Sequence, residues 1–247
     1  MRCFTKGRDY PSGRIRGVKL LALETSTHML SVALAIDDRQ VGRSEFCVNG
    51  GSDRLLPWVQ QVLAEAGISL QQLDAIAFGA GPGSFTGLRM ACGVAQGLAY
   101  GADLPVIPIV TLAALALSQG SGRILACLDA RMNEVYCAAY EVNGDEADEV
   151  LAPSVCPPEF LPLPQGLGWQ GCGDGFATYA DDITARIGAA LSSVDPQVPP
   201  LAPAVVRLAA MEFRQGRLLT ADQALPLYVR DKVALTTQER LARGGSK

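Results

Sequence analysis

The sequence predicts an α/β protein made of two related halves. In residues 18–110 the apolar patterns follow the order of three strands, a helix, a strand, a helix and a strand, which is the order of a ribonuclease-H-like unit. A second and less complete pass of this order begins at residue 111 and runs to about 172. The composition allows a sizeable core, because 49% of the 247 residues are hydrophobic and 19% are charged. We therefore expect two ribonuclease-H-like halves.

The individual elements follow from apolar runs, capping residues and turn residues. The first half is expected to contain a hairpin (19–24 and 30–36), a strand within 39–48, a helix from 52 to a stop at Gly67, a strand around Ile76 and Phe78, a helix at 85–101 and a strand at 105–110. The second half is expected to contain a helix at 111–119, a strand at 123–130, its hairpin return at 133–142, and helical stretches at 176–193 and 203–219. Proline-rich connectors are expected at 152–168 and 194–203.

These elements divide the chain into four segments. A basic extension at 1–17 precedes an N-terminal lobe at 18–109, a smaller C-terminal lobe at 110–200 and a tail at 218–247, and a helix at about 203–217 completes the N-terminal lobe. The first nineteen residues carry six basic side chains against a single acid, Asp9, and show no apolar periodicity. A flexible leader or a start codon placed too far upstream is favoured over an RNA-touching arm or a targeting segment, because unpatterned termini are usually disordered.

Charge, cysteine and histidine counts narrow the function classes. The net charge of −4 argues against a stand-alone nucleic-acid binder. The seven cysteines are odd in number and form no C-x-x-C pair, which is typical of a reducing cytosol and not of a disulfide scaffold or a zinc site. The single histidine, His28, excludes a two-histidine metal motif, and there is no G-x-S-x-G elbow for a hydrolase triad. We expect a cytoplasmic protein with no metal site, no evident catalytic residue and no membrane span.

Residues 79–90, GAGPGSFTGLRM, form a glycine-rich loop between a predicted strand and a predicted helix. This arrangement aims backbone N–H groups and a helix dipole at an anion, and Ser84 or Thr86 is the expected N-cap. The spacing is not that of a Walker A loop, because Leu88 and Arg89 follow Gly87 where Lys and then Ser or Thr are required. Phosphate binding and tight helix–strand packing are equal alternatives for this loop.

The turn ETST at 24–27 corresponds in position to the Asp-x-Gly-Thr hairpin of nucleotide-binding kinases of the actin-like (ASKHA) superfamily. Ser26 replaces the glycine, and its side chain would crowd a phosphate at close approach. Glu24 takes the position of the acid, and Asp74 and Asp129 also lie at predicted strand ends, although each acid suits a turn or a cap equally well. The pattern indicates a weakened nucleotide pocket. Its tentative nucleotide-binding residues are Thr25, Ser26, Thr27, Gly81, Gly83 and Ser84.

Two predicted helices carry more apolar surface than one core requires. The helix from residue 52 has a broad apolar arc, and the helix at 85–101 has almost no polar face. Glycines at 93, 97 and 101 are four apart, which would let another helix approach closely. A fully buried central helix is the alternative, but a protein–protein interface agrees at least as well with a chain of this size. The candidate interface residues are Leu55, Leu56, Val59, Val62, Leu63, Leu88, Arg89, Met90, Val94 and Leu98.

Four stretches of the sequence resemble the TsaB (YeaZ) family. They are LLALETSTHMLSVAL, LDAIAFGAGPGSFTGLRMACGVAQGLAYGADLPVIPIVTL, LDARMNEVYCAAY and PLYVRDKVA, in the family's order from about residue 18 to 235. GPGSFTGLR followed by DAR-x-x-EVY is the most specific part. The resemblance implies an actin-like fold and a non-catalytic role in the threonylcarbamoyladenosine modification of tRNA. It also implies that the metal-binding histidine pair of the transferase TsaD is lacking, which agrees with the single His28.

The resemblance further implies the partners. Proteins of this family pair with TsaD, which carries out the transfer, and the ATPase TsaE joins them; alone they form homodimers. Both pairings use the helical face of the N-terminal half, tRNA is contacted only through the complex, and any ATP or ADP would bind at a site shared with the partner. Two features depart from the family: the basic stretch before Val18, and GGSDRLLP, where relatives often carry a His or similar residue before LLP.

Two other functions are alternatives to the role that this resemblance implies. A small-molecule kinase of the same superfamily would need an intact phosphate hairpin, and Ser26 and the lack of an evident catalytic base argue against it. A peptidase would need a metal pair or a triad, and the sequence supplies neither.

Overall fold

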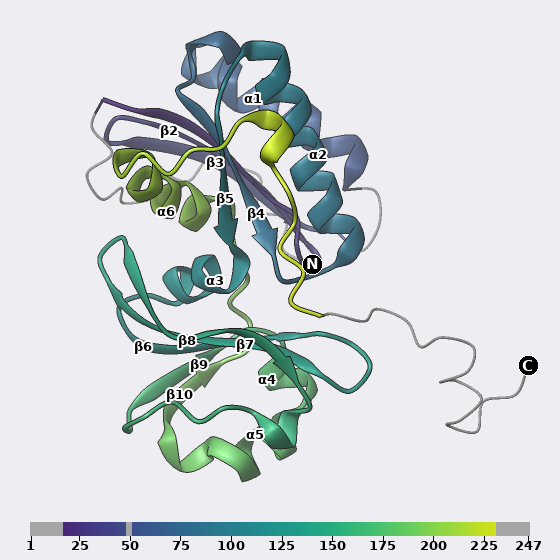
Figure 1. Cartoon of the computed structure of the whole chain (residues 1–247), viewed down its shortest axis with the longest axis vertical. Coiled ribbons are helices and arrows are strands. Elements are labelled where there is room, and N and C mark those ends of the chain that lie inside the picture. The colour runs from purple at the N-terminus through teal and green to yellow at the C-terminus, as the bar shows by residue number, and fades with distance from the viewer. Residues whose placement is uncertain (1–16, 48–50, 231–247) are drawn as a thin grey trace, which may run out of the picture.

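The computed structural model describes residues 17–47 and 51–230, which form five stacked layers (Figure 1). Helices α1 (Ser52–Ala66) and α2 (Phe85–Ala102) cover one face of the first sheet. Helices α3 (Thr111–Gln119) and α6 (Ala202–Arg214) lie between the first and second sheets. Helices α4 (Gly175–Thr178) and α5 (Ala180–Ile187) cover the outer face of the second sheet. Short 3₁₀ turns are present at Leu70–Gln72, Pro158–Phe160, Gly188–Ala190 and Ala221–Gln223.

The two sheets repeat one strand order. The first has the order β3-β2-β1-β4-β5, from β1 (Lys19–Glu24), β2 (Met29–Ile36), β3 (Arg39–Phe46), β4 (Ala75–Gly81) and β5 (Val106–Val110). The second has the order β10-β9-β6-β7-β8, from β6 (Gly122–Asp129), β7 (Val135–Asn143), β8 (Glu146–Cys156), β9 (Trp169–Cys172) and β10 (Leu191–Asp195). In each sheet the first three strands are antiparallel, and the last two run parallel to the first. This repeat confirms the two ribonuclease-H-like halves.

Helix α6 returns to the first sheet although it follows the second sheet in the sequence. Gln40 Nε2 donates to the Pro203 carbonyl oxygen at 3.1 Å, and Ala202 N donates to Ser31 Oγ at 3.1 Å, so two buried polar side chains of the first sheet hold the start of this helix. The apolar side chains of α3 and α6 pack against both sheets, and one continuous core therefore joins the two lobes.

Most expected elements are confirmed close to their predicted ends. Helix α1 stops at Gly67, which has φ 69°, a left-handed conformation that glycine adopts without strain. Helix α2 begins directly after Ser84, although the Ser84 side chain makes no capping hydrogen bond. The clear boundaries follow from turn residues placed between strongly apolar runs.

Two expectations about the second lobe are wrong. The predicted helix at 176–193 breaks at Thr178 and ends at Ile187, and its last residues belong to β10, because pairing with β9 overrides the helical preference of the small residues. The predicted connector at 152–168 begins too early, since β8 extends to Cys156. Pro153 is tolerated there because β8 is an edge strand and its register is irregular at this point.

Two further predictions concern the chain ends and the membrane. Residues 1–16 of the predicted extension and 231–247 of the predicted tail lie outside the described ranges, and the exact lobe boundaries stay predictions. Among the residues that the structure describes, none of the helices is long and apolar enough to cross a membrane.

Candidate functional site

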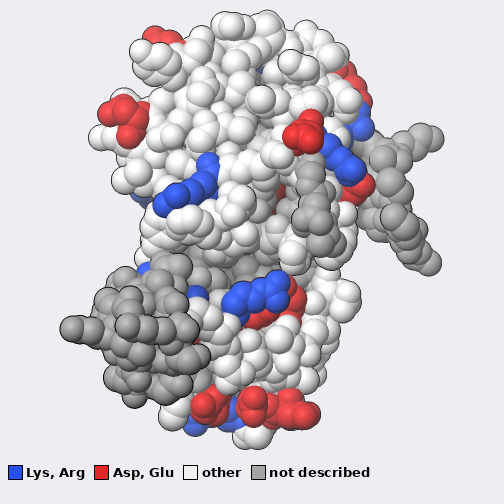
Figure 2. Space-filling model, turned by 90° about the vertical axis from the view of Figure 1, so that its right-hand side faces the viewer, with Lys and Arg blue, Asp and Glu red and all other residues white. Residues whose placement is uncertain are grey.

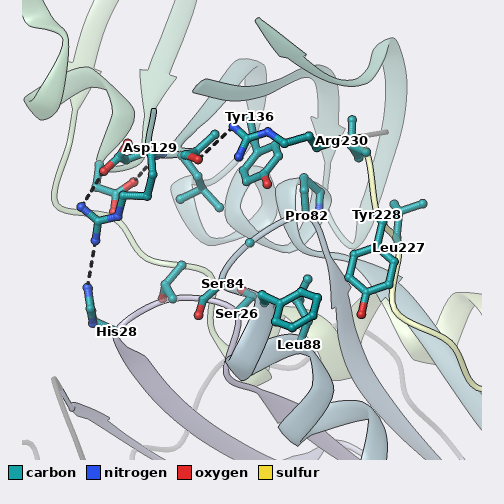
Figure 3. Close-up of a pocket in the computed structure, with 18 residues that line it drawn as sticks. Ser26, His28, Pro82, Ser84, Leu88, Asp129, Tyr136, Leu227, Tyr228 and Arg230 are labelled. Carbon is teal, nitrogen blue, oxygen red and sulfur yellow. Dashed lines mark hydrogen bonds and ion pairs between the residues drawn. The ribbon is translucent and has the colours of Figure 1, made fainter. Parts of the chain in front are cut away.

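A cavity of ≈ 320 Å³ lies between the two lobes (Figure 3). The first lobe contributes the β1–β2 turn at 26–28 and the glycine loop at 82–85. The second lobe contributes the end of β6 and the loop that follows it, at 128–131. The chain segment 227–230 forms a further wall. The cavity therefore combines segments that lie far apart in the sequence.

Glycines let the glycine loop close onto the β1–β2 turn. A Cβ atom at Gly87 would lie 1.9 Å from the Thr25 carbonyl oxygen, and one at Gly83 would lie 2.5 Å from the Ser26 carbonyl oxygen. Both distances are too short for a real side chain, so glycine is required for this approach. In addition, Thr25 Oγ1 donates to the Gly87 carbonyl oxygen at 2.7 Å. These contacts support the packing interpretation of the loop.

Three backbone N–H groups of this region donate to acceptors within the protein. Ser26 N donates to Glu24 Oε1 at 2.6 Å, and Ser84 N donates to the Ser26 carbonyl oxygen at 2.7 Å. Gly81 N donates to Thr111 Oγ1 at 3.2 Å. A phosphate-binding loop turns such donors toward its anion instead. The turn and the loop are thus bonded to each other at the place where a nucleotide pocket would hold a phosphate.

Glu24 is a fully buried acid beneath this turn. Its Oε2 atom has no hydrogen-bond partner among the described residues, and it lies so close to Gly79 that a Cβ there would approach to 1.9 Å. Burial raises the pKa of Glu24, and the hydrogen bonds from Ser26 only partly oppose this rise. Burial of this kind opposes the ionised form that a hydrated metal ion would need as a ligand.

The second lobe presents an ordered acidic pair to the cavity. Asp129 Oδ1 accepts hydrogen bonds from Arg131 N at 2.8 Å and from the Tyr179 hydroxyl at 3.1 Å. Asp129 N donates to Asp174 Oδ1 at 2.9 Å. Burial raises the pKa of Asp174, and the neighbouring Asp129 carboxylate adds to the rise. Arg131 Nη1 pairs with Asp129 Oδ2 at 3.0 Å, so the charges of this wall are largely balanced.

The β6–β7 loop next to this pair has an unusual backbone. Arg131, Met132 and Asn133 have φ values of 59°, 57° and 61°, in the left-handed region that residues other than glycine rarely occupy. Such a conformation persists only where surrounding contacts fix it. Here Arg131 Nη2 lies 3.4 Å from His28 Nε2, a contact that bridges the lobes (Figure 3).

The segment 227–230 ties both lobes together. Leu227 N donates to the Ala80 carbonyl oxygen at 2.7 Å in the first lobe. In the second lobe, Arg230 Nη2 donates to the Ala130 carbonyl oxygen at 3.0 Å, and Arg230 forms an ion pair with Glu134. Figure 3 shows Arg230 beside the Tyr136 ring. Arg230 therefore holds both ends of the strained loop.

The structure brings together only part of the predicted site. Four of the tentative nucleotide-binding residues line the cavity: Ser26, Thr27, Gly83 and Ser84. Thr25 lines a second hollow of ≈ 290 Å³ near the starts of α1 and α2. Gly81 lies against the segment 227–230, where a Cβ atom would be 2.7 Å from the Leu227 carbonyl oxygen. Asp74 lies at the opposite end of β1, where its Oδ2 accepts a hydrogen bond from Lys19 N at 2.6 Å. Sequence reasoning missed Arg131, Tyr136, Asp174 and 227–230 as wall residues, although the DAR-x-x-EVY motif contains the first two.

The predicted partner interface stays a prediction, and its residues differ in how far they are exposed. Five of its residues are buried in the first lobe: Leu55, Val59, Val62, Leu63 and Leu88. Their apolar arc is the one that each helix needs for its own core, so these side chains are not available to a partner. Leu56 and Arg89 are exposed, and Met90, Val94 and Leu98 are half-buried.

The surface in Figure 2 is sparsely charged. Lys and Arg side chains of the described residues are scattered over this face and alternate with Asp and Glu, and large areas are white. A tRNA-binding protein usually shows a basic stripe on one face. The described part of this face has no continuous stripe of that kind.

Comparisons with known proteins identify the family. The tRNA threonylcarbamoyladenosine biosynthesis protein TsaB of Escherichia coli is 36% identical over 227 residues, which are 88% of this chain and 96% of that protein. The chain belongs to the TsaB family. TsaB of Haemophilus influenzae is 37% identical over 232 residues, 89% of this chain and 96% of that protein. The solved structure of YeaZ from Pseudomonas aeruginosa has 39% identity and a TM-score of 0.80, and the match covers 85% of this chain and 99% of that one.

A family model described as TsaD, tRNA N6-adenosine threonylcarbamoyltransferase, matches residues 49–171. The matched range includes the glycine loop and the β6–β7 hairpin. Within residues 17–47 and 51–230, no group of three or more His, Cys, Asp or Glu side chains is placed to hold a metal ion.

Proposed function

We propose that this chain is a non-catalytic partner subunit for the transfer of threonylcarbamoyl to adenosine 37 of tRNA. In this role it pairs with a TsaD-like transferase, is joined by a TsaE-like ATPase, forms a homodimer when alone and contacts tRNA only through the complex. It acts in the cytoplasm. Membership of the TsaB family supports the pathway, and the surface of α2 supports the role of partner.

The exposed face of α2 is the observation that carries this proposal. Gly93, Gly97 and Gly101 are exposed, and a Cβ atom at any of them would meet nothing within 4 Å. Packing inside the chain therefore does not require glycine at these positions, although each glycine weakens a helix by about 0.5–1 kcal/mol relative to alanine. By helical spacing Tyr100, which is 85% exposed, lies on the same side. A smooth helical face bordered by an exposed aromatic ring suits close docking of another chain.

The internal bonding of the β1–β2 turn argues against catalysis by this chain alone. Ser26 N and Ser84 N, which would have to face a phosphate, already donate to protein acceptors. We infer that any adenine nucleotide at Thr25–Thr27 and the glycine loop is held jointly with the partner. Calorimetric titration with ADP tests this inference: we expect binding to the mixture with a TsaD-like protein and not to this chain alone. Turnover of ATP by the pure chain would favour a small-molecule kinase instead.

Reconstitution tests the role directly. Formation of threonylcarbamoyladenosine is measured in a mixture of tRNA, threonine, bicarbonate, ATP, the enzyme that makes threonylcarbamoyl-AMP, a TsaD-like protein and a TsaE-like protein, with and without this chain. Modification that depends on this chain supports the proposal. Modification that is indifferent to it overturns the proposal.

Surface variants test the docking face. Leu56 is 46% exposed on α1, and a carboxylate placed there would be unpaired in an apolar interface. We expect Leu56→Asp to lower the fraction of dimer, or of complex with a TsaD-like protein, in analytical ultracentrifugation. Gln61→Asp is the control, because it adds an acid at another exposed position of the same helix. An equal effect of both variants would indicate a general charge effect and would remove α1 from the interface.

A further inference from the structure

Three cysteines form a row across the second sheet. Cys127 of β6 is the register partner of Cys137 of β7. Cys156, the last residue of β8, pairs in register with Val135 and so lies diagonal to Cys137. Since alternate residues of a strand share a face, all three side chains lie on the face covered by α4 and α5. The sulfur atoms of Cys137 and Cys156 are 4.0 Å apart.

The three thiols differ in exposure and in their hydrogen bonds. Cys127 is fully buried, Cys137 is nearly so, and Cys156 is partly exposed. The Cys137 sulfur lies 3.3 Å from Ser154 Oγ, so its immediate neighbours are the Ser154 hydroxyl and the Cys156 thiol. The hydrogen bonds from Cys156 and Ser154 lower the pKa of Cys137. The same hydrogen bond with Cys137, together with burial, raises the pKa of Cys156, and burial raises the pKa of Cys127. One thiol of the pair is therefore reachable from solvent, and its neighbour is suited to act as a nucleophile.

We propose that Cys137 and Cys156 are a site of reversible disulfide formation with a low-molecular-weight disulfide as the oxidant. The Cys137 thiolate takes the proton of the neighbouring Cys156 thiol, and the Cys156 sulfur attacks the oxidant, whose S–S bond breaks. One thiolate leaves and takes up this proton, which returns Cys137 to its thiolate form. The Cys137 thiolate then attacks the Cys156 sulfur, the new S–S bond forms, and the second thiolate leaves. Two protein thiols are oxidised and one small disulfide is reduced to two thiols, so the electrons balance.

The position of Cys156 allows the necessary movement. The sulfur atoms must approach by roughly 2 Å to reach a disulfide bond length. Cys156 is the last residue of β8, β8 is the edge strand of its sheet, and its register with β7 is already irregular. The closed disulfide would fasten the end of β8 to β7, one residue from Tyr136 in the cavity wall.

The experiment incubates the full chain with glutathione disulfide. Free thiols are then alkylated and the products are mapped by peptide mass spectrometry. We expect loss of the Cys137 and Cys156 thiols together, a linked peptide pair, no glutathione retained on either residue, and full recovery after dithiothreitol. Cys137→Ser should trap glutathione on Cys156, because the resolving thiol is missing.

Matched variants make the outcome decisive. Cys47→Ser removes another partly exposed thiol and should leave the linkage unchanged. Cys127→Ser should also leave it unchanged. Three outcomes would each overturn the proposal. They are a linkage between Cys127 and Cys137, an equal yield of intramolecular disulfide in Cys156→Ser, and glutathione retained on Cys156 in the chain without substitutions. Circular dichroism of Cys137→Ser checks that this variant is folded. The check separates a loss of thiol chemistry from a loss of structure.

Discussion

Gly87→Ala tests whether the glycine loop is built for packing. The new methyl group would lie 1.9 Å from the Thr25 carbonyl oxygen, so the β1–β2 turn and α2 must separate. Overpacking of this kind costs about 1–3 kcal/mol, and loss of the hydrogen bond from Thr25 Oγ1 costs about 0.5–1.5 kcal/mol more. Alanine recovers about 1 kcal/mol through its better helix propensity. The expected net loss of stability is roughly 2 kcal/mol, within a range of about 0.5–3.5 kcal/mol.

Gly93→Ala is the matched control on the same helix. A Cβ at Gly93 meets nothing within 4 Å, so only the propensity gain applies, and this variant should be more stable by about 0.5–1 kcal/mol. Urea denaturation followed by circular dichroism, at two protein concentrations to separate folding from pairing, measures both values. If Gly87→Ala proves as stable as Gly93→Ala, the loop has room beside the turn and the packing argument is refuted.

Two further predictions concern the buried acid and the segment 227–230. Burial raises the folded-state pKa of Glu24 above about 4.3, its pKa in the unfolded chain. The folded chain should therefore lose stability as the pH rises from about 4.3 through the raised value. Glu24→Gln should lack this part of the pH dependence. Urea midpoints at several pH values check this, and parallel curves for both proteins would contradict it. Arg230→Ala should destabilise the chain by about 1–3 kcal/mol, because it removes a charged hydrogen bond to the Ala130 carbonyl and the ion pair with Glu134. Arg230→Lys should recover only part of this, since lysine lacks the planar fork, and a full recovery in thermal melts would show that charge alone matters.

The repeated architecture could be predicted from the sequence because its signals are local. Apolar runs, the stop at Gly67 and the strand–glycine–helix order each depend on a few neighbouring residues. The edge strands are harder to predict from the sequence. Strand β10 exists because β9 lies beside it, and its own residues, such as Ser192 and Ser193, carry little strand preference.

The candidate site was predictable only on its first-lobe side. Ser26, Gly83 and Ser84 lie in recognisable turn and loop motifs, whereas Asp174 and Arg230 reach the cavity through long-range topology. The predicted interface includes residues such as Val59, which the structure buries in the first lobe, for a related reason. Hydrophobic periodicity identifies an apolar face of a helix, but it does not say whether the chain's own sheet or another chain covers that face.

The shared core of α3 and α6 has a mechanical consequence. Enzymes that close two lobes over a substrate need a hinge whose surfaces can separate. In this chain the apolar side chains of both sheets pack on the same two helices, so parting the lobes would expose a core to water. The two lobes are therefore expected to keep one relative arrangement. A chain that docks on α2 would find the wall formed by Asp129, Arg131 and Asp174, and the strained loop of the other lobe, at a fixed distance and orientation.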